Sequence, residues 1–194
     1  LKCFARTIHT EYIPTIPKSK KLARHMIYLA TKAVPEGLII VDGDKTSGVE
    51  SIIRDLKKHT KITNVVSKAH GKMAWFETPT NLDLYKDIPT KIEGGFETQA
   101  GVFSSDGVDP ASKLLAHFIS QDLSGTGADL GGGWGYLSVK ALERNNISEL
   151  HFIEADLSAL NVARNNINDQ RVMFYWYDAL KWKAPKLLDF IIMN

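Results

Sequence analysis

The chain has 194 residues, of which 44% are hydrophobic and 24% charged, as in ordinary soluble globular proteins, and no apolar run approaches the ~20 residues of a membrane span. Its net charge of +2 is unevenly distributed, because residues 1–72 carry 14 basic and 6 acidic side chains, whereas residues 73–194 carry 10 and 16. A basic half joined to an acidic half favours a polyanionic partner, although a solvated basic face would give the same count.

Residues 1–78 are predicted to form a small α/β unit. Apolar residues at helical spacing predict helices over 18–34 and 47–59, and a short apolar run between them predicts a buried strand over 37–43. Two more strands are expected within 62–78, one on each side of His70 and Gly71. Residues 79–95 contain two prolines and a glycine pair without clear periodicity, so we interpret them as a linker.

Residues 96–194 are predicted to form a second, larger α/β unit. Asp109 and Pro110 are typical of a helix start, with the aspartate as N-cap of a helix over 110–121. Four strands, expected over 126–130, 149–155, 172–179 and 187–194, are interleaved with helices over 134–145 and 157–167. This alternation predicts a parallel, doubly wound sheet, and the aromatic run 172–179 is interpreted as a central strand buried on both faces.

A glycine-rich turn follows the first of these strands. Asp129, Gly131, Gly133 and Gly135 stand where the strand gives way to a helix, and glycines there let a ligand approach backbone amides near the helix start. Tight packing of a turn would also favour glycines. Tyr136 occupies the position of the last glycine in a G-x-G-x-x-G dinucleotide fingerprint, which argues against a nicotinamide-dependent oxidoreductase.

Polar residues also end the other three strands. Glu154 is a carboxylate able to accept both hydroxyls of a ribose, Asp178 can accept from an adenine amine, and the amide carbonyl of Asn194 can hold an amino group. Simpler roles exist, since Glu154 could cap the helix over 157–167 and Asp178 could open a turn. Because ligands of such sheets bind beyond the carboxyl ends of the strands, the four successive polar ends together predict a ligand site.

These segments resemble a known family. ADLGGGWGYLS (128–138) is similar to the first motif of class I S-adenosylmethionine-dependent methyltransferases. Together with residues 101–119, 151–167 and 189–194, it resembles the methyltransferase small-domain (MTS) group and, more narrowly, bacterial 16S rRNA guanine-N2 methyltransferases of the RsmC type. In that family a degenerate methyltransferase-like domain precedes the catalytic one. The resemblance implies an RNA-binding domain of that kind over 1–78, a linker over 79–95 and a Rossmann-like cofactor-binding domain over 96–194 that lacks its C-terminal part.

The resemblance also implies the chemistry. The enzyme would transfer a methyl group from S-adenosyl-L-methionine to the exocyclic N2 of a guanine, with ribosomal RNA or the small ribosomal subunit as partner. Asn194 would open an Asn-Pro-Pro-aromatic motif and act as the catalytic residue. The implied cofactor-binding residues are Phe103, Asp129, Gly131, Gly133, Gly135, Glu154 and Asp178. Asp129 would help to hold the amino group of the cofactor, Glu154 its ribose diol and Asp178 its adenine amine.

The basic first unit has its own predicted site. Lys18, Lys20, Lys21 and Arg24 cluster at the start of the first helix, and we expect this group to bind RNA phosphates. The histidines show no metal-ligand spacing, so no metal is expected.

Two other functions remain open from the sequence. One is a non-catalytic RNA-binding or assembly module with a vestigial cofactor pocket, and the other is a methyltransferase that acts on adenine N6 or on protein glutamine. The single cysteine, Cys3, excludes an internal disulfide and predicts a reducing compartment, the cytoplasm. The chain begins with Leu1 and stops at Asn194 after an apolar run, so we interpret it as a piece of a longer protein.

Overall fold

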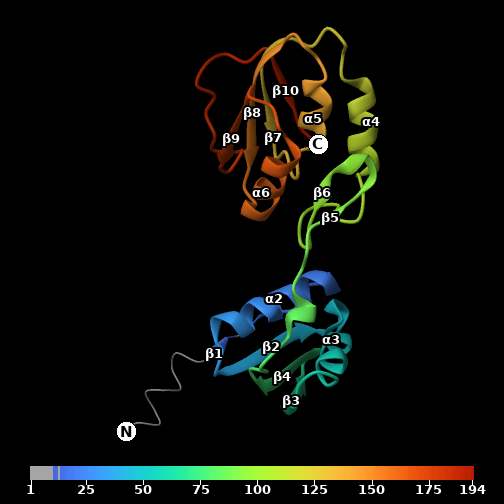
Figure 1. Ribbon diagram of the computed structural model, residues 1–194, viewed down its shortest axis with the longest axis vertical. Helices are drawn as coiled ribbons and strands as arrows, with labels where there is room; N and C mark the ends of the chain where they lie inside the picture. The colour runs from blue at the N-terminus through green and yellow to red at the C-terminus, as the bar shows by residue number, and fades with distance from the viewer. Residues whose placement is uncertain (1–10, 13) are drawn as a thin grey trace. The chain divides into compact units, whose positions relative to one another are not determined.

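The computed structural model describes residues 11, 12 and 14–194, so Cys3 lies outside the described residues. The chain divides into two compact units, Leu1–Ile88 and Pro89–Asn194, each of which is described by itself (Figure 1). The division falls inside the segment predicted as a linker. Leu82 and Tyr85 are buried in the core of the first unit, so this segment contributes structure as well as a connection. In the described part of the chain, no helix is long and apolar enough to cross a membrane.

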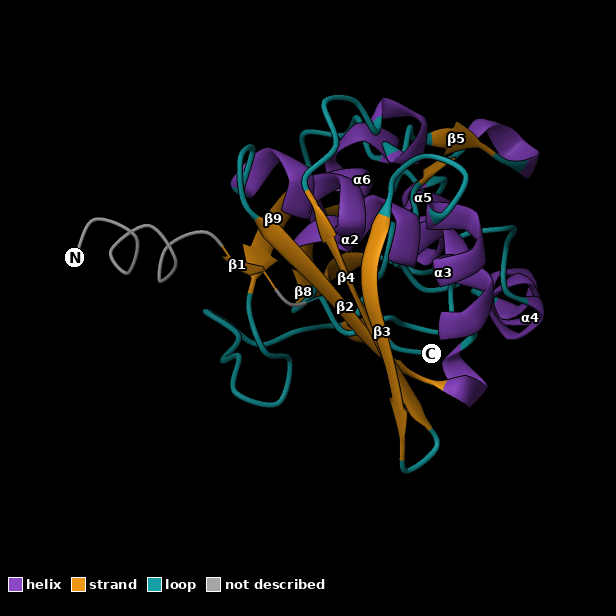
Figure 2. Ribbon diagram, turned by 90° about the horizontal axis from the view of Figure 1, so that it is seen from below, coloured by secondary structure: helices purple, strands orange, loops and turns teal. Residues whose placement is uncertain are grey.

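The first unit is a four-stranded mixed sheet with helices. Its strands are β1 (Glu11–Tyr12), β2 (Leu38–Asp44), β3 (Ile62–Lys68) and β4 (Gly71–Glu77), in the order β1-β2-β4-β3. Its helices are α2 (Lys20–Ala33), α3 (Val49–Leu56) and the short 3-10 helices η1 (Lys45–Ser47) and η2 (Asp83–Tyr85). β2, β4 and β3 run side by side in Figure 2, with antiparallel pairing. The predicted helices, strand and hairpin are confirmed.

The core of the first unit forms because each helix has one apolar face. Ala23, Ile27 and Ala30 recur at helical spacing along α2 and are fully buried. α3 buries a similar face, and the two helices share one core with alternate residues of β2 and β4, including Ile39, Val41, Ala74 and Phe76.

The second unit contains a parallel sheet. Its strands are β7 (Gly125–Leu130), β8 (Ile147–Glu154), β9 (Val172–Trp176) and β10 (Phe190–Ile192), in the order β10-β7-β8-β9 (Figure 1). Its helices are α4 (Pro110–Phe118), α5 (Tyr136–Leu142) and α6 (Leu157–Asn166). A small hairpin of β5 (Thr90–Lys91) and β6 (Glu97–Thr98), joined through η3 (Glu93–Gly95), precedes α4. The predicted parallel sheet is confirmed.

The strand order fixes where a ligand can bind. The chain runs from β7 through β8 to β9 and then returns to β10 on the other side of β7, so the order reverses between β7 and β10. Phe152 of β8 and Leu160 and Ala163 of α6 are fully buried in one core that also includes residues of α5 and β10. The pairing of β7 with both β10 and β8 holds the carboxyl ends of the three strands in one place, beside the switch point.

The predicted position of the aromatic strand is wrong. β9 pairs only with β8 and lies at the edge of the sheet, with Met173 48% exposed and Trp176 61% exposed. Val172 and Phe174 lie on the opposite face of the strand from Met173 and pack against the core, whereas Trp176, at the end of the strand, does not. The strand is thus apolar throughout although only part of it is packed. From residue types alone, such an edge strand cannot be distinguished from a central strand that is buried on both faces.

Candidate functional site

The glycine-rich turn lies between β7 and α5. Gly131, Gly133 and Gly135 have φ values of 72°, 59° and 96°, in the left-handed region that residues with a Cβ rarely adopt. The turn is held against β8, because the backbone N–H groups of Gly131 and Gly132 both donate to the carbonyl of Ile153, at 2.8 and 3.1 Å.

The glycines of this turn serve two purposes. A Cβ at Gly132 would lie 2.3 Å from the ring of Phe152, and one at Gly135 would lie 2.8 Å from Ile167, so these two positions are small because the core packs against them. At Gly131 and Gly133 no protein atom lies within 4 Å of the position of a Cβ. Packing does not require glycine there, and the bare backbone at these two positions borders open space that a ligand can enter.

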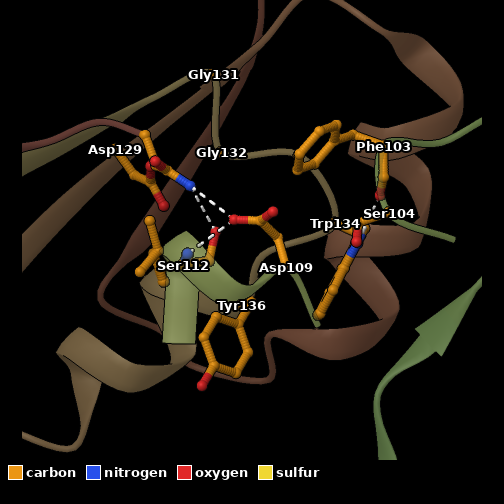
Figure 3. A pocket seen from close by; sticks show the side chains of 12 residues that line it. Phe103, Ser104, Asp109, Ser112, Asp129, Gly131, Gly132, Trp134 and Tyr136 are labelled. Atoms are coloured by element: carbon orange, nitrogen blue, oxygen red, sulfur yellow. Dashed lines mark hydrogen bonds between the residues drawn. The ribbon is translucent and has the colours of Figure 1, made fainter. Parts of the chain in front are cut away.

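A pocket opens against this bare surface (Figure 3). It is lined by Phe103, Ser104, Asp109, Ser112, Asp129, Gly131, Gly132, Gly133, Trp134, Tyr136, Leu137 and Asn194. The structure thus brings together five residues predicted from the sequence: Phe103, Asp129, Gly131, Gly133 and Asn194. Asp109, Ser112, Trp134 and Tyr136 also line the pocket, although the sequence did not single them out as binding residues.

Asp129 is the buried acid of the pocket. Its side chain accepts a hydrogen bond of 2.6 Å from the hydroxyl of Ser138, and the residue is only 1% exposed. Burial raises the pKa of Asp129 to about 6, with a smaller contribution from the negative charge of Glu154. The ionised carboxylate is therefore costly in the free protein and is suited to a cationic ligand.

Asp129→Asn is expected to stabilise the free protein at about pH 8 but much less at about pH 4.5. The pKa of Asp129 in the folded state lies above its ordinary value, so stability falls as pH rises from about 4 to about 6 and the loss persists above that range, amounting to roughly 3 kcal/mol. Asparagine keeps the hydrogen bond from Ser138 without the charge. Urea midpoints at the two pH values test this, with Asp156→Asn, an exposed position, as control. An equal gain at both pH values would contradict it.

Glu154 points toward the glycine turn. Its Oε2 accepts from the backbone N–H of Gly133 at 2.7 Å, and its Oε1 accepts from that of Asp156 at 2.8 Å. The N-cap of α6 is Asp156, which accepts from Ser158, so Glu154 does not have the capping role that the sequence left open. Its carboxylate instead joins the end of β8 to the glycine turn.

Asn194 lies two residues after β10 and faces the start of α4. Its Nδ2 donates to Oδ2 of Asp109 at 3.2 Å and to Oγ of Ser112 at 2.8 Å, and Figure 3 draws these bonds beside Asp109 and Ser112. Asp109 is the N-cap of α4, as predicted, and accepts from the backbone N–H of Ser112. The side chain predicted to be catalytic is therefore held at the pocket by the start of a helix.

Phe103 and Trp134 form another side of the pocket. Phe103 is 67% exposed, and its carbonyl accepts a 2.9 Å hydrogen bond from Nε1 of Trp134. The backbone carbonyl of Trp134 accepts from Nδ2 of Asn166, which also donates to the carbonyl of Glu97, while the N–H of Glu97 donates to Oδ1 of Asn166. One asparagine therefore ties the hairpin before the pocket to the glycine turn.

Three predicted residues are absent from the pocket lining: Gly135, Asp178 and Glu154. Glu154 reaches the glycine turn only through its bond to Gly133. Gly135 sits beneath Ile167. Asp178 accepts from the backbone N–H of Leu180 at 2.9 Å and lies 3.6 Å from Nζ of Lys181, in a separate hollow that Ala155, Trp176 and Tyr177 also line. The local contacts of Asp178 are those of an acid that opens a turn, and its adenine-binding role stays a prediction.

The basic cluster of the first unit is divided by its ion pairs. Arg24 donates through Nε and Nη2 to Oδ2 of Asp55, at 2.9 and 2.6 Å, and Lys21 pairs with Asp87 at 2.9 Å. Lys18 and Lys20 are exposed. Arg24 thus has a structural role, and the contact of this cluster with RNA stays a prediction.

Comparisons with known proteins agree with this site. The chain is 26% identical over 207 residues to the ribosomal RNA small subunit methyltransferase C of Acinetobacter baylyi, an alignment that covers 98% of this chain and 61% of the relative. It is also 26% identical to the ribosomal RNA large subunit methyltransferase G of Yersinia enterocolitica, over 80% of this chain and 41% of the relative. The chain thus spans less than two thirds of the length of these relatives.

A solved structure with a similar fold is that of a T. thermophilus 16S rRNA N2 methyltransferase (RsmC) in complex with AdoMet and guanosine. The TM-score is 0.70 at 20% identity, over 95% of this chain and 55% of that one. This likeness confirms the predicted fold class. The family model described as "Methyltransferase small domain" matches residues 93–194, more than half of the chain. The chain therefore belongs to the methyltransferase small domain family.

Proposed function

We propose that the protein transfers a methyl group from S-adenosylmethionine to the exocyclic N2 of a guanine in small-subunit ribosomal RNA. The observation that carries the proposal is the position of Asn194 in the same pocket as the bare backbone of Gly131 and Gly133. Family membership supports methyl transfer. The small-subunit relative from Acinetobacter and the likeness to the T. thermophilus enzyme support guanine in ribosomal RNA over other acceptors. Such a substrate also favours a cytoplasmic location.

The residues of the pocket fit S-adenosylmethionine, which supplies an electrophilic methyl group on a sulfonium when bound. Gly131 and Gly133 offer a surface that a Cβ would fill, Asp129 lines the same pocket, and the carboxylate of Glu154 is bonded to the N–H of Gly133. Both the sulfonium and the α-ammonium group of this ligand are positive. Its binding therefore offsets the cost of the buried Asp129 carboxylate.

The pocket itself encloses about 50 Å³, whereas ligands of nucleoside size need ~300 Å³ or more. The ligand must therefore extend beyond the lining of the pocket. Ala155, which follows Glu154, lines the hollow that contains Asp178. This supports a path from Glu154 toward Asp178 for the adenine, and we keep that role for Asp178 as part of the proposal.

Asn194 is proposed to act on the nucleophile. The N2 amine of guanine is a weak nucleophile because its lone pair is delocalised into the ring. A carbonyl that accepts from the amine draws the lone pair out of conjugation and directs it toward the methyl group. No strong base is needed, so the protein contributes mainly alignment, for which effective molarities of ~10⁵ M or more are available. The target base must be unpaired or flipped, since N2 is engaged in a duplex.

The proposal is tested with the natural full-length polypeptide, small ribosomal subunits or their naked RNA, and labelled S-adenosylmethionine. Nucleoside mass spectrometry is expected to find N2-methylguanosine. Label in adenine N6 or in protein glutamine would replace the proposed substrate with one of the alternatives. Cofactor binding without transfer to any of these acceptors would favour the non-catalytic RNA-binding module.

We propose that the first unit binds ribosomal RNA through its basic cluster. Reversing the charge of Lys18 and Lys20 to glutamate is expected to weaken RNA binding and to reduce the slope of log affinity against log salt by about 2, one for each phosphate that is no longer neutralised. Both side chains are exposed, so folding is little affected. Filter binding between low and moderate salt measures the slope.

The matched control reverses Lys57 and Lys61, which are also exposed and lie at and beyond the end of α3. The charge of Lys57, the C-cap of α3, complements the helix C-terminus and needs no partner. Equal loss of affinity in both double variants would contradict a localised site.

A further inference from the structure

The side chain of Asn194 must adopt one of two orientations to act as proposed. An asparagine amide carries two N–H donors on one side and one carbonyl acceptor on the other, and the two ends have nearly the same shape. With the carbonyl toward the substrate, the side chain accepts from an amine. With the NH₂ group toward the substrate, the side chain presents its N–H donors to the N–H donors of the substrate amine, and the two groups repel each other. The surroundings of the amide decide between these states.

Two acceptors of α4 face the NH₂ group of Asn194. Nδ2 lies 3.2 Å from Oδ2 of Asp109 and 2.8 Å from Oγ of Ser112. The two N–H groups therefore have two protein partners, and Oδ1 is left to accept from a ligand. This orientation of the Asn194 amide is favoured because the ionised carboxylate of Asp109 can only accept. If the amide were rotated by half a turn, its carbonyl oxygen would face that carboxylate, and two acceptors would meet.

The charge of Asp109 is maintained by its place at the helix start. The backbone N–H of Ser112 donates to Asp109 and holds the pKa of the carboxyl below its usual value, with further contributions from the side chains of Asn194 and Ser112. Asp109 is thus an acceptor across the neutral pH range. Leu115 and Ala116 of α4 pack against the same core as Leu137 and Ile192, which keeps the helix start at a fixed distance from the end of β10.

We propose that Asp109 and Ser112 are positioning residues that orient the Asn194 amide, with its carbonyl presented to the amine that is methylated. The inference rests on the proposed function of Asn194 and adds to it two residues, Asp109 and Ser112, that act through Asn194. Neither side chain needs to touch the cofactor or the reacting atoms.

The decisive experiment exchanges the donor and the acceptor in the full-length polypeptide. Asp109→Asn keeps a good N-cap but removes the acceptor-only group, and it is expected to lower kcat about tenfold with an unchanged KM for S-adenosylmethionine. Asn194→Asp keeps an acceptor for the amine but faces Asp109 with a like charge, and it is expected to lower kcat by ~10²-fold. In the double variant the amide at position 109 can donate to the carboxylate at position 194.

The double variant is therefore expected to be several times more active than Asn194→Asp alone, although each single change is harmful. A merely structural role of Asp109 predicts no such rescue. A double variant that is as inactive as Asn194→Asp, or less active, would overturn the inference. Asp156→Asn is the control, since it changes another aspartate N-cap of the second unit, and its kcat is expected to match the wild type.

A readout without turnover accompanies the kinetics. In ¹⁵N spectra, the side-chain NH₂ resonances of Asn194, assigned by their absence in Asn194→Asp, are expected to shift in Asp109→Asn and in Ser112→Ala. Unshifted resonances would show that the amide is not bonded to α4 and would overturn the inference. This result does not depend on the substrate. If guanine is not the acceptor, the proposed function fails while the orientation of Asn194 is still measured.

Discussion

Asn194→Ala is expected to abolish methyl transfer in the full-length polypeptide, with a loss in kcat of ~10²- to 10³-fold, as for the removal of one preorganised hydrogen-bonding group from an active site. The truncation removes the carbonyl that accepts from the substrate amine. It also removes the bonds of Asn194 to Asp109 and Ser112, which are exposed enough for water to replace them. Because none of the proposed cofactor contacts comes from β10 or the residues after it, affinity for S-adenosylmethionine is expected to stay close to that of the wild type.

Two measurements separate these effects. Initial rates with saturating cofactor give kcat, and calorimetric titration gives the cofactor Kd. Asn145→Ala, at an exposed position after α5, is the matched control and is expected to leave both values unchanged. Normal turnover by Asn194→Ala would remove Asn194 from the mechanism, and a parallel loss of cofactor binding would assign it to the binding site instead.

Gly132→Ala is expected to destabilise the second unit by about 3 kcal/mol, at the upper end of overpacking effects. The added methyl carbon would lie 2.3 Å from Cε2 of Phe152, a ring with no exposed surface that packs in the middle of the core. Neither the ring nor the turn can move away freely, because the N–H of Gly132 is bonded to the carbonyl of Ile153. The change in urea midpoint of the full chain measures the loss.

Gly131→Ala is the matched comparison, one residue away. Its methyl group meets no protein atom within 4 Å, so the cost to folding is limited to the left-handed backbone, about 1–2 kcal/mol. The same methyl group occupies the surface on which the cofactor is proposed to lie, and affinity for S-adenosylmethionine is expected to fall at least tenfold, or ~1.4 kcal/mol. Unchanged cofactor affinity in Gly131→Ala would contradict the role of Gly131 as a binding surface. Unchanged stability in Gly132→Ala would contradict the role of Gly132 in core packing.

Periodicity and polar strand ends were sufficient to predict the fold and much of the pocket. The alternation of apolar strands with helices predicted the parallel sheet, and such sheets have their strand ends at one edge. For this reason Asp129, Gly131, Gly133 and Asn194 could be placed together before any distance was known. Phe103 required the resemblance to the methyltransferase family, because no pattern around it indicates a pocket.

Other parts of the site depend on contacts that a linear pattern does not contain. Asp109 was recognised as an N-cap, but its bond to Asn194 joins residues far apart in the chain and follows from the return of β10 beside β7. Arg24 was assigned to RNA because it stands among lysines. The acid that engages it, Asp55, comes from another helix. The edge position of β9 was not predicted for the same reason, because the order of the strands depends on the whole sheet and not on the sequence of one strand.

The three hydrogen bonds of Asn166 have a consequence for how the protein can vary. Its amide both accepts from and donates to the backbone of Glu97, as a peptide group of a neighbouring strand would, and it grips the carbonyl of Trp134 as well. A single side chain thus substitutes for a strand pairing between the hairpin and the body of the second unit. Aspartate at this position loses the donors and leucine loses all three bonds, so either change is expected to loosen the wall formed by Phe103 and Trp134, although Phe96 still packs against Trp134. An amide that lies outside the pocket is therefore expected to affect how firmly one wall of the pocket is held.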